Sequence, residues 1–201
     1  MPSHLTLDGV SVAEPPPSKG SRFIGHAAPI QNAAEAMAYV DSIRQRYPDA
    51  THHCFAWRTA AGDGGWRASD DGEPGGTAGR PILARIDGAE LIGVVVVVVR
   101  YYGGTNLGKG GLIRGYGGGA AAALKQATVI SVRETKPLHV RIAYGDQGAV
   151  QGVLRKFDVS PSRERFDTEV HLELAIPTED VDALCQALKD GTGGRATLDS
   201  F

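Results

Sequence analysis

The chain has 201 residues, and its 21 basic and 23 acidic side chains give a formal net charge of −2 at pH 7. This balance excludes both a strongly basic protein that coats nucleic acid and an acidic disordered chain. Glycine contributes 27 residues, about twice the roughly 7% share of average proteins, but it shows no Gly-X-Y period, which excludes a collagen-like chain.

The first two thirds of the sequence alternate between strand and helix patterns. Three consecutive prolines indicate that residues 1–20 form a loose arm. Asn32 and Glu35 have the spacing of a capping box at the start of a helix. The run Val94–Val99 predicts a central strand buried on both faces, because its apolar side chains are continuous and β-branched. The patterns together predict strands at 21–28, 51–58 and 94–99, and helices at 32–47, 77–85 and 111–127.

The pattern changes after Pro137. Alternating apolar residues predict strands at 138–144 and 169–176, and helices capped by Asp146 and Thr178 follow them. With short strands near Val159 and at 197–201, the order is βαββαβ, which is typical of a ferredoxin-like domain. We therefore predict an α+β protein with two domains, residues 1–133 and 134–201.

Neither the start of the chain nor its cysteines indicate an export or metal-binding role. Met1 is not followed by a basic segment and an apolar segment, so no secretory signal is predicted. The longest apolar run, 91–99, is too short to span a bilayer. Cys54 and Cys185 lie far apart and indicate no disulfide framework or zinc site. A cytoplasmic protein with no metal and no cofactor is expected.

A glycine cluster, Gly103 to Gly119, lies between the valine strand and the next helix. Gly103-x4-Gly108-Lys109 matches most of a Walker A loop, but Gly110 stands where a Ser or Thr would hold Mg²⁺. Backbone N–H groups of a glycine loop at a helix N-terminus still make an anion site, to which Arg100, Lys109 and Arg114 add charge. Alternatively, the glycines only turn the chain and let the helix pack.

The charge around this cluster favours an anionic ligand. Residues 91–133 contain five basic and no acidic side chains. Tyr101, Tyr102 and Tyr116 lie in or near this stretch and are candidates for stacking on bases. The alternative is that these tyrosines belong to the core.

A second glycine cluster, Gly62 to Gly79, contains the carboxylates of Asp70, Asp71 and Glu73. Three carboxylates in four positions suit Mg²⁺ binding or acid–base chemistry. Asp-Gly and Pro-Gly are also ordinary turn signals, so a turn that caps the next helix is the alternative. His52 and Cys54 share one strand face. They are either two metal ligands or interior side chains.

These motifs resemble the YigZ/IMPACT family. The resemblance rests on Ser21-Arg22-Phe23-Ile24, on Ala50-Thr51-His52-x-Cys54, on the segment from Ser69 to Leu83, and on the segment from Val97 to Tyr116. They occur in family order over residues 18–126. The chain departs from the family at Tyr102, where Phe is common, and at Gly115 and Gly117–Gly119, where relatives usually carry Ala or larger residues.

The resemblance implies an N-terminal domain with the ribosomal protein S5 domain 2-like fold, a two-layer α/β sandwich. It also implies a C-terminal domain similar to one of the translocation elongation factor. Eukaryotic relatives are translation regulators, and bacterial relatives are implied to have a translation-linked or nucleic-acid-binding role. Some relatives carry a proline-dipeptidase label.

Three functions remain open from the sequence. The first is a non-enzymatic regulatory protein that binds RNA, the ribosome or a translation-associated protein. The second is a metal-dependent hydrolase that uses Asp70, Asp71 and Glu73, and the third is a protein-interaction module. No catalytic residue is predicted. The predicted binding surface comprises His52, Asp70, Asp71, Glu73, Thr77, Gly79, Arg100, Tyr101, Tyr102, Gly103, Gly104, Lys109, Gly110, Gly111, Arg114 and Tyr116.

Overall fold

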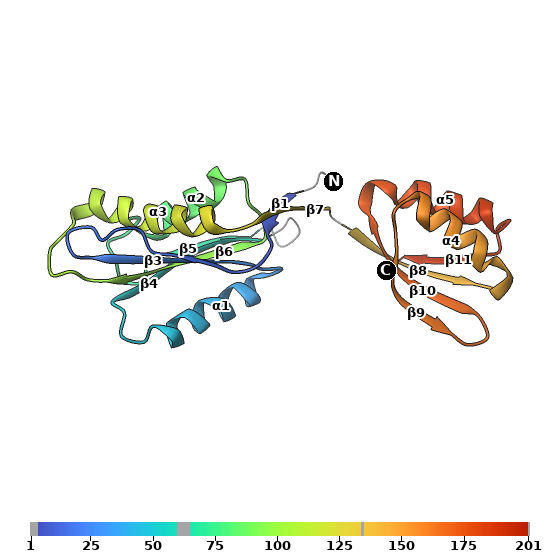
Figure 1. Cartoon of the computed structure of the whole chain (residues 1–201), viewed down its shortest axis with the longest axis horizontal. Helices are drawn as coiled ribbons and strands as arrows, with labels where there is room; N and C mark the ends of the chain where they lie inside the picture. Colours follow the sequence, from blue (N-terminus) through green and yellow to red (C-terminus); the bar gives the residue numbers. More distant parts are fainter. Residues whose placement is uncertain (1–3, 60–64, 134, 201) are drawn as a thin grey trace. The chain divides into compact units, whose positions relative to one another are not determined.

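The computed structural model describes residues 4–59, 65–133 and 135–200 (Figure 1). Gly62 and Gly64, and Phe201 of the expected last strand, lie outside the described residues. The chain divides into two compact units, His4–Val132 and a second unit that begins at Arg133. Both units mix helices and strands, which confirms the predicted α+β fold.

The first unit is built on a five-stranded antiparallel sheet with the valine strand at its centre. All six side chains of Val94–Val99 are completely buried, so the predicted central strand is confirmed. Alternate valines face opposite cores, as the two-residue period of a strand requires. The strands in sheet order are β2 (Ser11–Ala13), β3 (Arg22–Pro29), β6 (Val94–Tyr101), β4 (His52–Arg58) and β5 (Trp66–Ser69).

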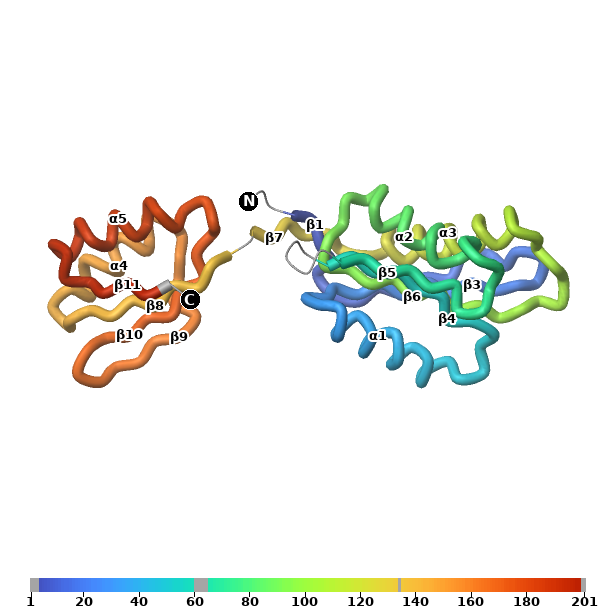
Figure 2. Tube along the Cα trace, turned by 180° about the vertical axis from the view of Figure 1, so that it is seen from behind, coloured from blue at the N-terminus to red at the C-terminus, as the bar shows by residue number. Residues whose placement is uncertain are grey.

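Helices cover both faces of this sheet (Figures 1 and 2). On one face α2 (Gly79–Gly88) and α3 (Gly108–Gln126) enclose one core, and on the other α1 (Ala33–Arg46) encloses a second. The α/β sandwich implied by the resemblance therefore has three layers here rather than two. The extra layer follows from residues such as Val40 and Ile43, whose apolar side chains pack onto the second sheet face.

The predicted helix cap at Asn32 is confirmed, but Glu35 bonds the N–H of the residue before the cap rather than that of Asn32. Asn32 Oδ1 accepts a hydrogen bond from the Glu35 N–H at 2.9 Å, and Glu35 Oε2 accepts one from the Gln31 N–H at 2.8 Å. The first bond satisfies a backbone donor that a helix start leaves without a partner, and the second fixes the residue that precedes the cap.

The expectation of a loose arm over residues 1–20 is wrong, because this segment forms two short strands. β1 (His4–Leu7) pairs with β7 (Val129–Val132), and β2 pairs with β3. Leu7 is buried, and Ser11 Oγ donates to the Ala123 carbonyl. The partners of β1 and of Ser11 Oγ lie more than a hundred residues away, so the local proline-rich composition gives no indication of them.

The glycines of α3 allow the helix to lie close to the sheet. A Cβ at Gly25 would lie 2.1 Å from the Gly119 carbonyl oxygen, and one at Gly115 would lie 2.4 Å from the Phe23 ring. Gly118 is different, because a Cβ there would meet nothing within 4 Å. A Cβ at Gly119 would lie 2.9 Å from Val98 Cγ1, so close packing explains Gly115 and Gly119, and nothing in the structure explains Gly118.

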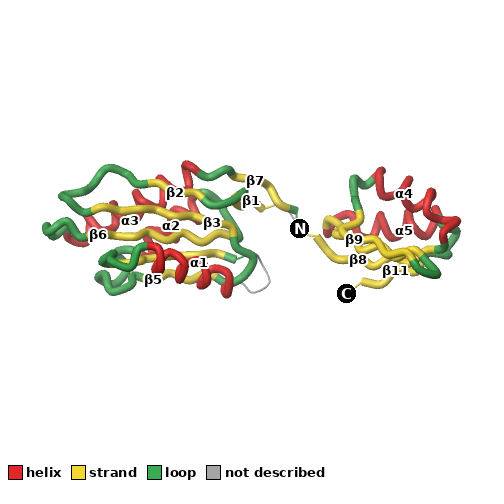
Figure 3. The backbone as a smooth tube through the Cα atoms, turned by 60° about the horizontal axis from the view of Figure 1, so that its bottom comes forward, coloured by secondary structure: helices red, strands yellow, loops and turns green. Residues whose placement is uncertain are grey.

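The second unit has the predicted βαββαβ order. Its antiparallel sheet has the strand order β11-β8-β10-β9, and both helices cover one face (Figure 3). Among the described residues of this unit, no helix covers the opposite face, which we call the uncovered face. The elements are β8 (Thr135–Ile142), η1 (Tyr144–Asp146), α4 (Gln147–Lys156), β9 (Pro161–Phe166), β10 (Val170–Pro177), η2 (Thr178–Asp180), α5 (Val181–Gly191) and β11 (Thr197–Ser200).

Three local predictions in this unit need correction. The strand expected near Val159 begins at Pro161. Asp146 does not cap α4, because its carboxylate accepts two hydrogen bonds from Arg195 instead. Thr178 begins a short 3₁₀ turn, and the helix starts three residues later.

Candidate binding site at the two glycine loops

Asp70 organises the loop between β5 and α2, residues 70–78, which we call the acidic loop. Its carboxylate accepts hydrogen bonds from the backbone N–H groups of Gly76, Ala78 and Gly79 at 2.8, 2.9 and 2.8 Å. Burial raises the pKa of Asp70, but the three N–H donors outweigh it, so the pKa lies below its usual value. Asp70 thereby holds the loop closed and serves the free N–H groups at the start of α2, as the turn-and-cap alternative predicts.

Asp71 ties the same loop to strand β4. Its Oδ2 accepts from the His53 N–H at 2.7 Å, and its Oδ1 lies 3.3 Å from Arg44 Nη2. Its own carbonyl oxygen lies 2.7 Å from His52 Nδ1. Asp71 has a φ of 43°, a left-handed conformation that Asp tolerates better than most residues.

Glu73 points into the interior, with only 4% of its side chain exposed. Its Oε1 accepts from Arg100 Nη1 at 2.5 Å and from the Tyr116 hydroxyl at 2.6 Å, and it lies 3.8 Å from His52 Nε2. This cluster, which we call the Glu73 network (His52, Glu73, Arg100 and Tyr116), joins the acidic loop to β4, β6 and α3. Buried charges need such partners, because each alone would be costly to desolvate.

Arg100 is a buried member of this network rather than a surface charge. Its Nη2 donates to Ser21 Oγ at 3.3 Å, and Ser21 Oγ also accepts from the Gly103 N–H at 3.2 Å. Its guanidinium group lies over the rings of Phe23 and Tyr102, at 5.7 and 5.4 Å from their centres. Arg100 therefore orients the glycine loop between β6 and α3, while Glu73 balances the charge of Arg100.

Cys54 and Tyr116 complete the interior beneath the acidic loop. Burial raises the pKa of the Cys54 thiol and of the Tyr116 phenol, so both side chains stay protonated at neutral pH. The thiol donates to the Asp70 carbonyl oxygen at 3.0 Å. A neutral, buried thiol is not an effective nucleophile. No group of three or more His, Cys, Asp or Glu side chains is arranged to hold a metal in the described part of the chain.

Exposed residues of the loop between β6 and α3, and of the first turns of α3, form a separate surface, which we call the loop rim (Tyr102, Gly103, Gly104, Lys109, Gly110 and Arg114). Tyr102 is 47% exposed, and both cations are exposed. α3 starts beside them at Gly108, with no side-chain cap and no acidic residue in its first turn. Its first N–H groups therefore point out of the helix without a side-chain partner and favour a negatively charged ligand.

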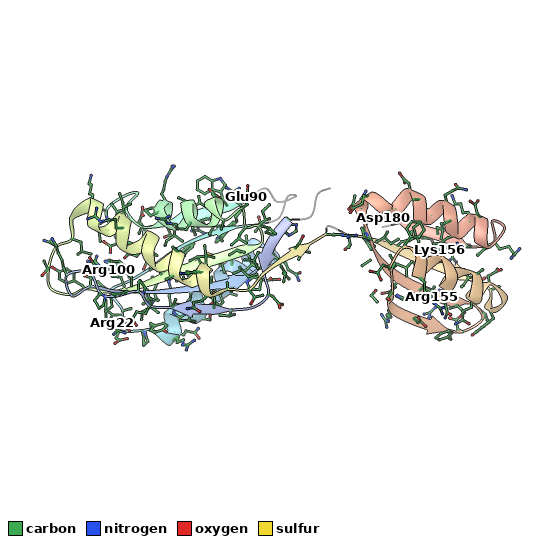
Figure 4. All side chains as sticks on the ribbon, turned by 45° about the horizontal axis from the view of Figure 1, so that its top comes forward. Arg22, Glu90, Arg100, Arg155, Lys156 and Asp180 are labelled. Atoms are coloured by element: carbon green, nitrogen blue, oxygen red, sulfur yellow. The ribbon has the colours of Figure 1, made fainter. Side chains whose placement is uncertain are left out.

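The predicted site residues thus separate into an interior and a rim. Thr77, Gly79 and Gly111 are buried, and a Cβ at Gly79 would lie 2.6 Å from the Ser69 backbone nitrogen. The Tyr101 hydroxyl donates to Asp49, and Arg22 lies over the Tyr101 ring. Figure 4 shows Arg22 and Arg100 at the same end of the first unit.

Two residues of this region were missed by the sequence analysis as site residues. Ser21 links Arg100 to the Gly103 backbone, and Ile113 exposes 45% of its surface beside Arg114. Ser21 belongs to the Ser21-Arg22-Phe23-Ile24 motif, which was a usable signal. Ile113 had no such signal, because helical periodicity alone does not show which apolar residue stays uncovered.

Both loops lie in a part of the chain that matches a known protein family. Residues 19–124 match the family described as the Impact N-terminal domain, and residues 140–195 match the domain of unknown function DUF1949. The chain belongs to the IMPACT family. The residues matched by the Impact N-terminal domain include both the Glu73 network and the loop rim.

Similar proteins span nearly the whole chain. The Escherichia coli K12 protein named IMPACT family member YigZ is 37% identical over 182 residues, which cover 90% of this chain and 89% of that protein. A Thermus thermophilus IMPACT family member is 40% identical over 176 residues, covering 87% and 95%. A crystal structure of a hypothetical protein is 35% identical with a TM-score of 0.74, covering 100% of this chain and 98% of that one.

A yeast relative matches only part of the chain. The Saccharomyces cerevisiae protein named Protein IMPACT homolog is 29% identical over 105 residues, covering 51% of this chain and 41% of that protein. Within the described ranges, no helix of this IMPACT family protein is long and apolar enough to cross a membrane.

Proposed function

We propose that this IMPACT family protein is a regulatory protein linked to translation, which contacts RNA, alone or within the ribosome, through the loop rim. The observation that carries the proposal is the meeting of an exposed tyrosine ring, two exposed cations and an uncapped helix N-terminus on one surface. These are groups that bind phosphates and stack on bases. The resemblance to a family whose eukaryotic members regulate translation supports the same role.

The alternative of a metal-dependent hydrolase has no specific observation in its favour. Asp70 and Asp71 bond backbone N–H groups of the acidic loop and of β4, and Glu73 bonds Arg100 and Tyr116. An acid–base or metal-binding carboxylate needs a lone pair directed at its ligand. These three carboxylates are instead directed at their own protein.

The test compares two charge reversals that are matched in size. Lys109→Glu with Arg114→Glu changes the loop rim, and Lys125→Glu with Arg133→Glu changes exposed cations of the same acid-free stretch beyond it. The affinity of the full chain for labelled RNA and for purified ribosomes is measured against salt concentration. We expect the rim variant to lose at least about tenfold, with a shallower salt dependence because two phosphate contacts are lost.

Equal losses in the two variants would contradict the proposal, because they would indicate a general charge effect. No loss in the rim variant would contradict it as well. Retention of a stoichiometric protein partner after nuclease treatment, with no RNA or ribosome binding, would favour the protein-interaction module instead.

A further inference from the structure

We propose that the uncovered sheet face of the second unit binds single-stranded RNA. His139 and His171 would stack on bases, and Arg163 and Arg165 would hold phosphates. This face belongs to a different unit from the loop rim, so the inference goes beyond the function proposed above and does not rest on it.

Strand alternation separates the two faces of this sheet. The even-numbered residues of β10, such as Leu172 and Leu174, are buried against the helices. His171 and Glu173 therefore point to the uncovered face, and their cross-strand partners share that face. The register pairs His171 with Arg141 and Arg165, and Glu173 with His139 and Arg163.

Two imidazole rings lie parallel on this face, on neighbouring central strands. The centres of the His139 and His171 rings are 5.5 Å apart, and their planes differ by 20°. Both residues are only partly buried. Flat side chains on a four-stranded sheet are a common way to bind unpaired bases, and histidine is one of the rings that bases stack on. A planar base can extend a stack that this pair has already begun.

The rings lie at a shallow hollow with a volume of about 220 Å³. This volume is below the range of about 300–1,000 Å³ that is typical of enclosed small-molecule pockets. Such a hollow suits one planar group at an open surface. Its lining consists of His139, Arg163, Arg165, His171 and Glu173.

Arg163 and Arg165 project from the edge strand β9 and are loosely held. Their side chains are 75% and 67% exposed. Arg163 lies 4.0 Å from Glu173, and Arg165 lies 2.9 Å from Asp167 in the following turn. Exposed ion pairs of this kind contribute little to stability, so both guanidinium groups can turn towards phosphates at small cost. Arg141 shares this face but pairs with Asp199 at 3.3 Å, on the other edge strand β11, where Asp199 lies opposite His139.

Glu173 and Asp167 restrict where an anion can bind. Glu173 lines the hollow, and Asp167 lies 3.5 Å from His171 Nε2. These carboxylates disfavour a phosphate in the hollow itself and leave the phosphates to the arginines at the edge. A carboxylate in the hollow is also an acceptor for the amino group of a base. The arrangement therefore fits single-stranded RNA better than a polyanion that has no bases.

The experiment separates stacking from charge in the full chain. Binding of a labelled single-stranded RNA of ten nucleotides and of linear polyphosphate is measured for three double variants: His139→Ala with His171→Ala, Arg163→Ala with Arg165→Ala, and Arg155→Ala with Lys156→Ala. The last pair lies in the last turn of α4 and is the matched charge control (Figure 4). A ring-preserving variant, His139→Tyr with His171→Tyr, tests rescue.

We expect the histidine-to-alanine variant to lose about tenfold in RNA affinity while polyphosphate binding stays unchanged, since each stacked base is worth about that much. The tyrosine variant should retain most RNA affinity. The arginine variant should weaken both ligands, and the control should change neither by more than about twofold.

Unchanged RNA affinity in the histidine-to-alanine variant would overturn the inference, as would an equal loss of polyphosphate binding. A failure of tyrosine to rescue binding would also overturn it. The loop rim variant Lys109→Glu with Arg114→Glu is measured beside these. If only the loop rim variant loses RNA affinity, the sheet inference fails while the proposed function stands. If only the histidine and arginine variants lose RNA affinity, the proposed function fails while the sheet inference stands.

Discussion

One ion pair in each unit shows two opposite uses of charged side chains. In the first unit, Glu73 and Arg100 are buried and hold two loops against the sheet. In the second, Arg163 and Glu173 lie on an uncovered sheet face at 4.0 Å, with most of both side chains exposed. The same ionic pairing thus maintains a shape in one unit and leaves side chains free to meet a ligand in the other. Burial, rather than residue type, decides which role a charge takes.

The largest effect on the free energy of unfolding is expected when the buried ion pair between Glu73 and Arg100 is broken. Glu73→Gln leaves the Arg100 charge buried without its counter-ion, which typically costs about 3–5 kcal/mol of unfolding free energy. Urea unfolding followed by tryptophan fluorescence measures it, because both tryptophans, Trp57 and Trp66, lie in the first unit. The double variant Glu73→Gln with Arg100→Met should recover part of the loss.

Glu173→Gln in the second unit is the matched control for this comparison. Because Glu173 is exposed, we expect no measurable change in the urea midpoint of the second unit, followed by far-ultraviolet circular dichroism because both tryptophans lie in the first unit. If Glu73→Gln were equally harmless, the contrast between the two units would be lost.

The next largest effect concerns acid stability. His26 is buried under the Tyr47 ring, and neither ring nitrogen has a hydrogen-bond partner among the described residues. Burial, with a smaller contribution from Arg46, lowers the pKa of His26 from 6.5 to about 4. The unfolded chain therefore binds a proton below pH 6.5 that the folded chain binds only near pH 4. The stability contribution is complete above pH 6.5 and declines as the pH falls to about 4.

Between pH 6.5 and about 4, the free energy of unfolding should fall by about 3 kcal/mol, because each pH unit is worth about 1.4 kcal/mol. Unfolding free energies between pH 7.5 and 4 measure it, with tryptophan fluorescence reporting on the first unit. His26→Leu removes the titrating group, and we expect a flatter pH dependence over the same window. Parallel curves for the variant and the parent chain would exclude His26 as the source.

The smallest effects test how closely α3 lies on the sheet. Gly115→Ala places a methyl group against the Phe23 ring and should destabilise by about 1–3 kcal/mol. Gly118→Ala has open space and should stabilise the helix by about 0.5–1 kcal/mol. Urea midpoints of the two variants measure both. Effects of the same sign would show that helix propensity, and not the close contact, governs this helix.

The sequence determined the local elements and the family motifs. The valine run predicted a doubly buried strand, Asn32 and Glu35 predicted a helix cap, and the pattern after Pro137 predicted the βαββαβ order. Each depends on neighbours within a few residues, where periodicity and capping operate.

Only the tertiary structure decided which predicted site residues reach the surface. Strand alternation places Arg100 on the same face as Val98, but which helix covers that face depends on contacts far apart in sequence. Glu73 lies 27 residues from Arg100, and no local pattern joins them. The strand residues of the N-terminal arm and the uncovered face of the second unit were decided in the same way, because burial is a property of the packed chain and not of any short segment.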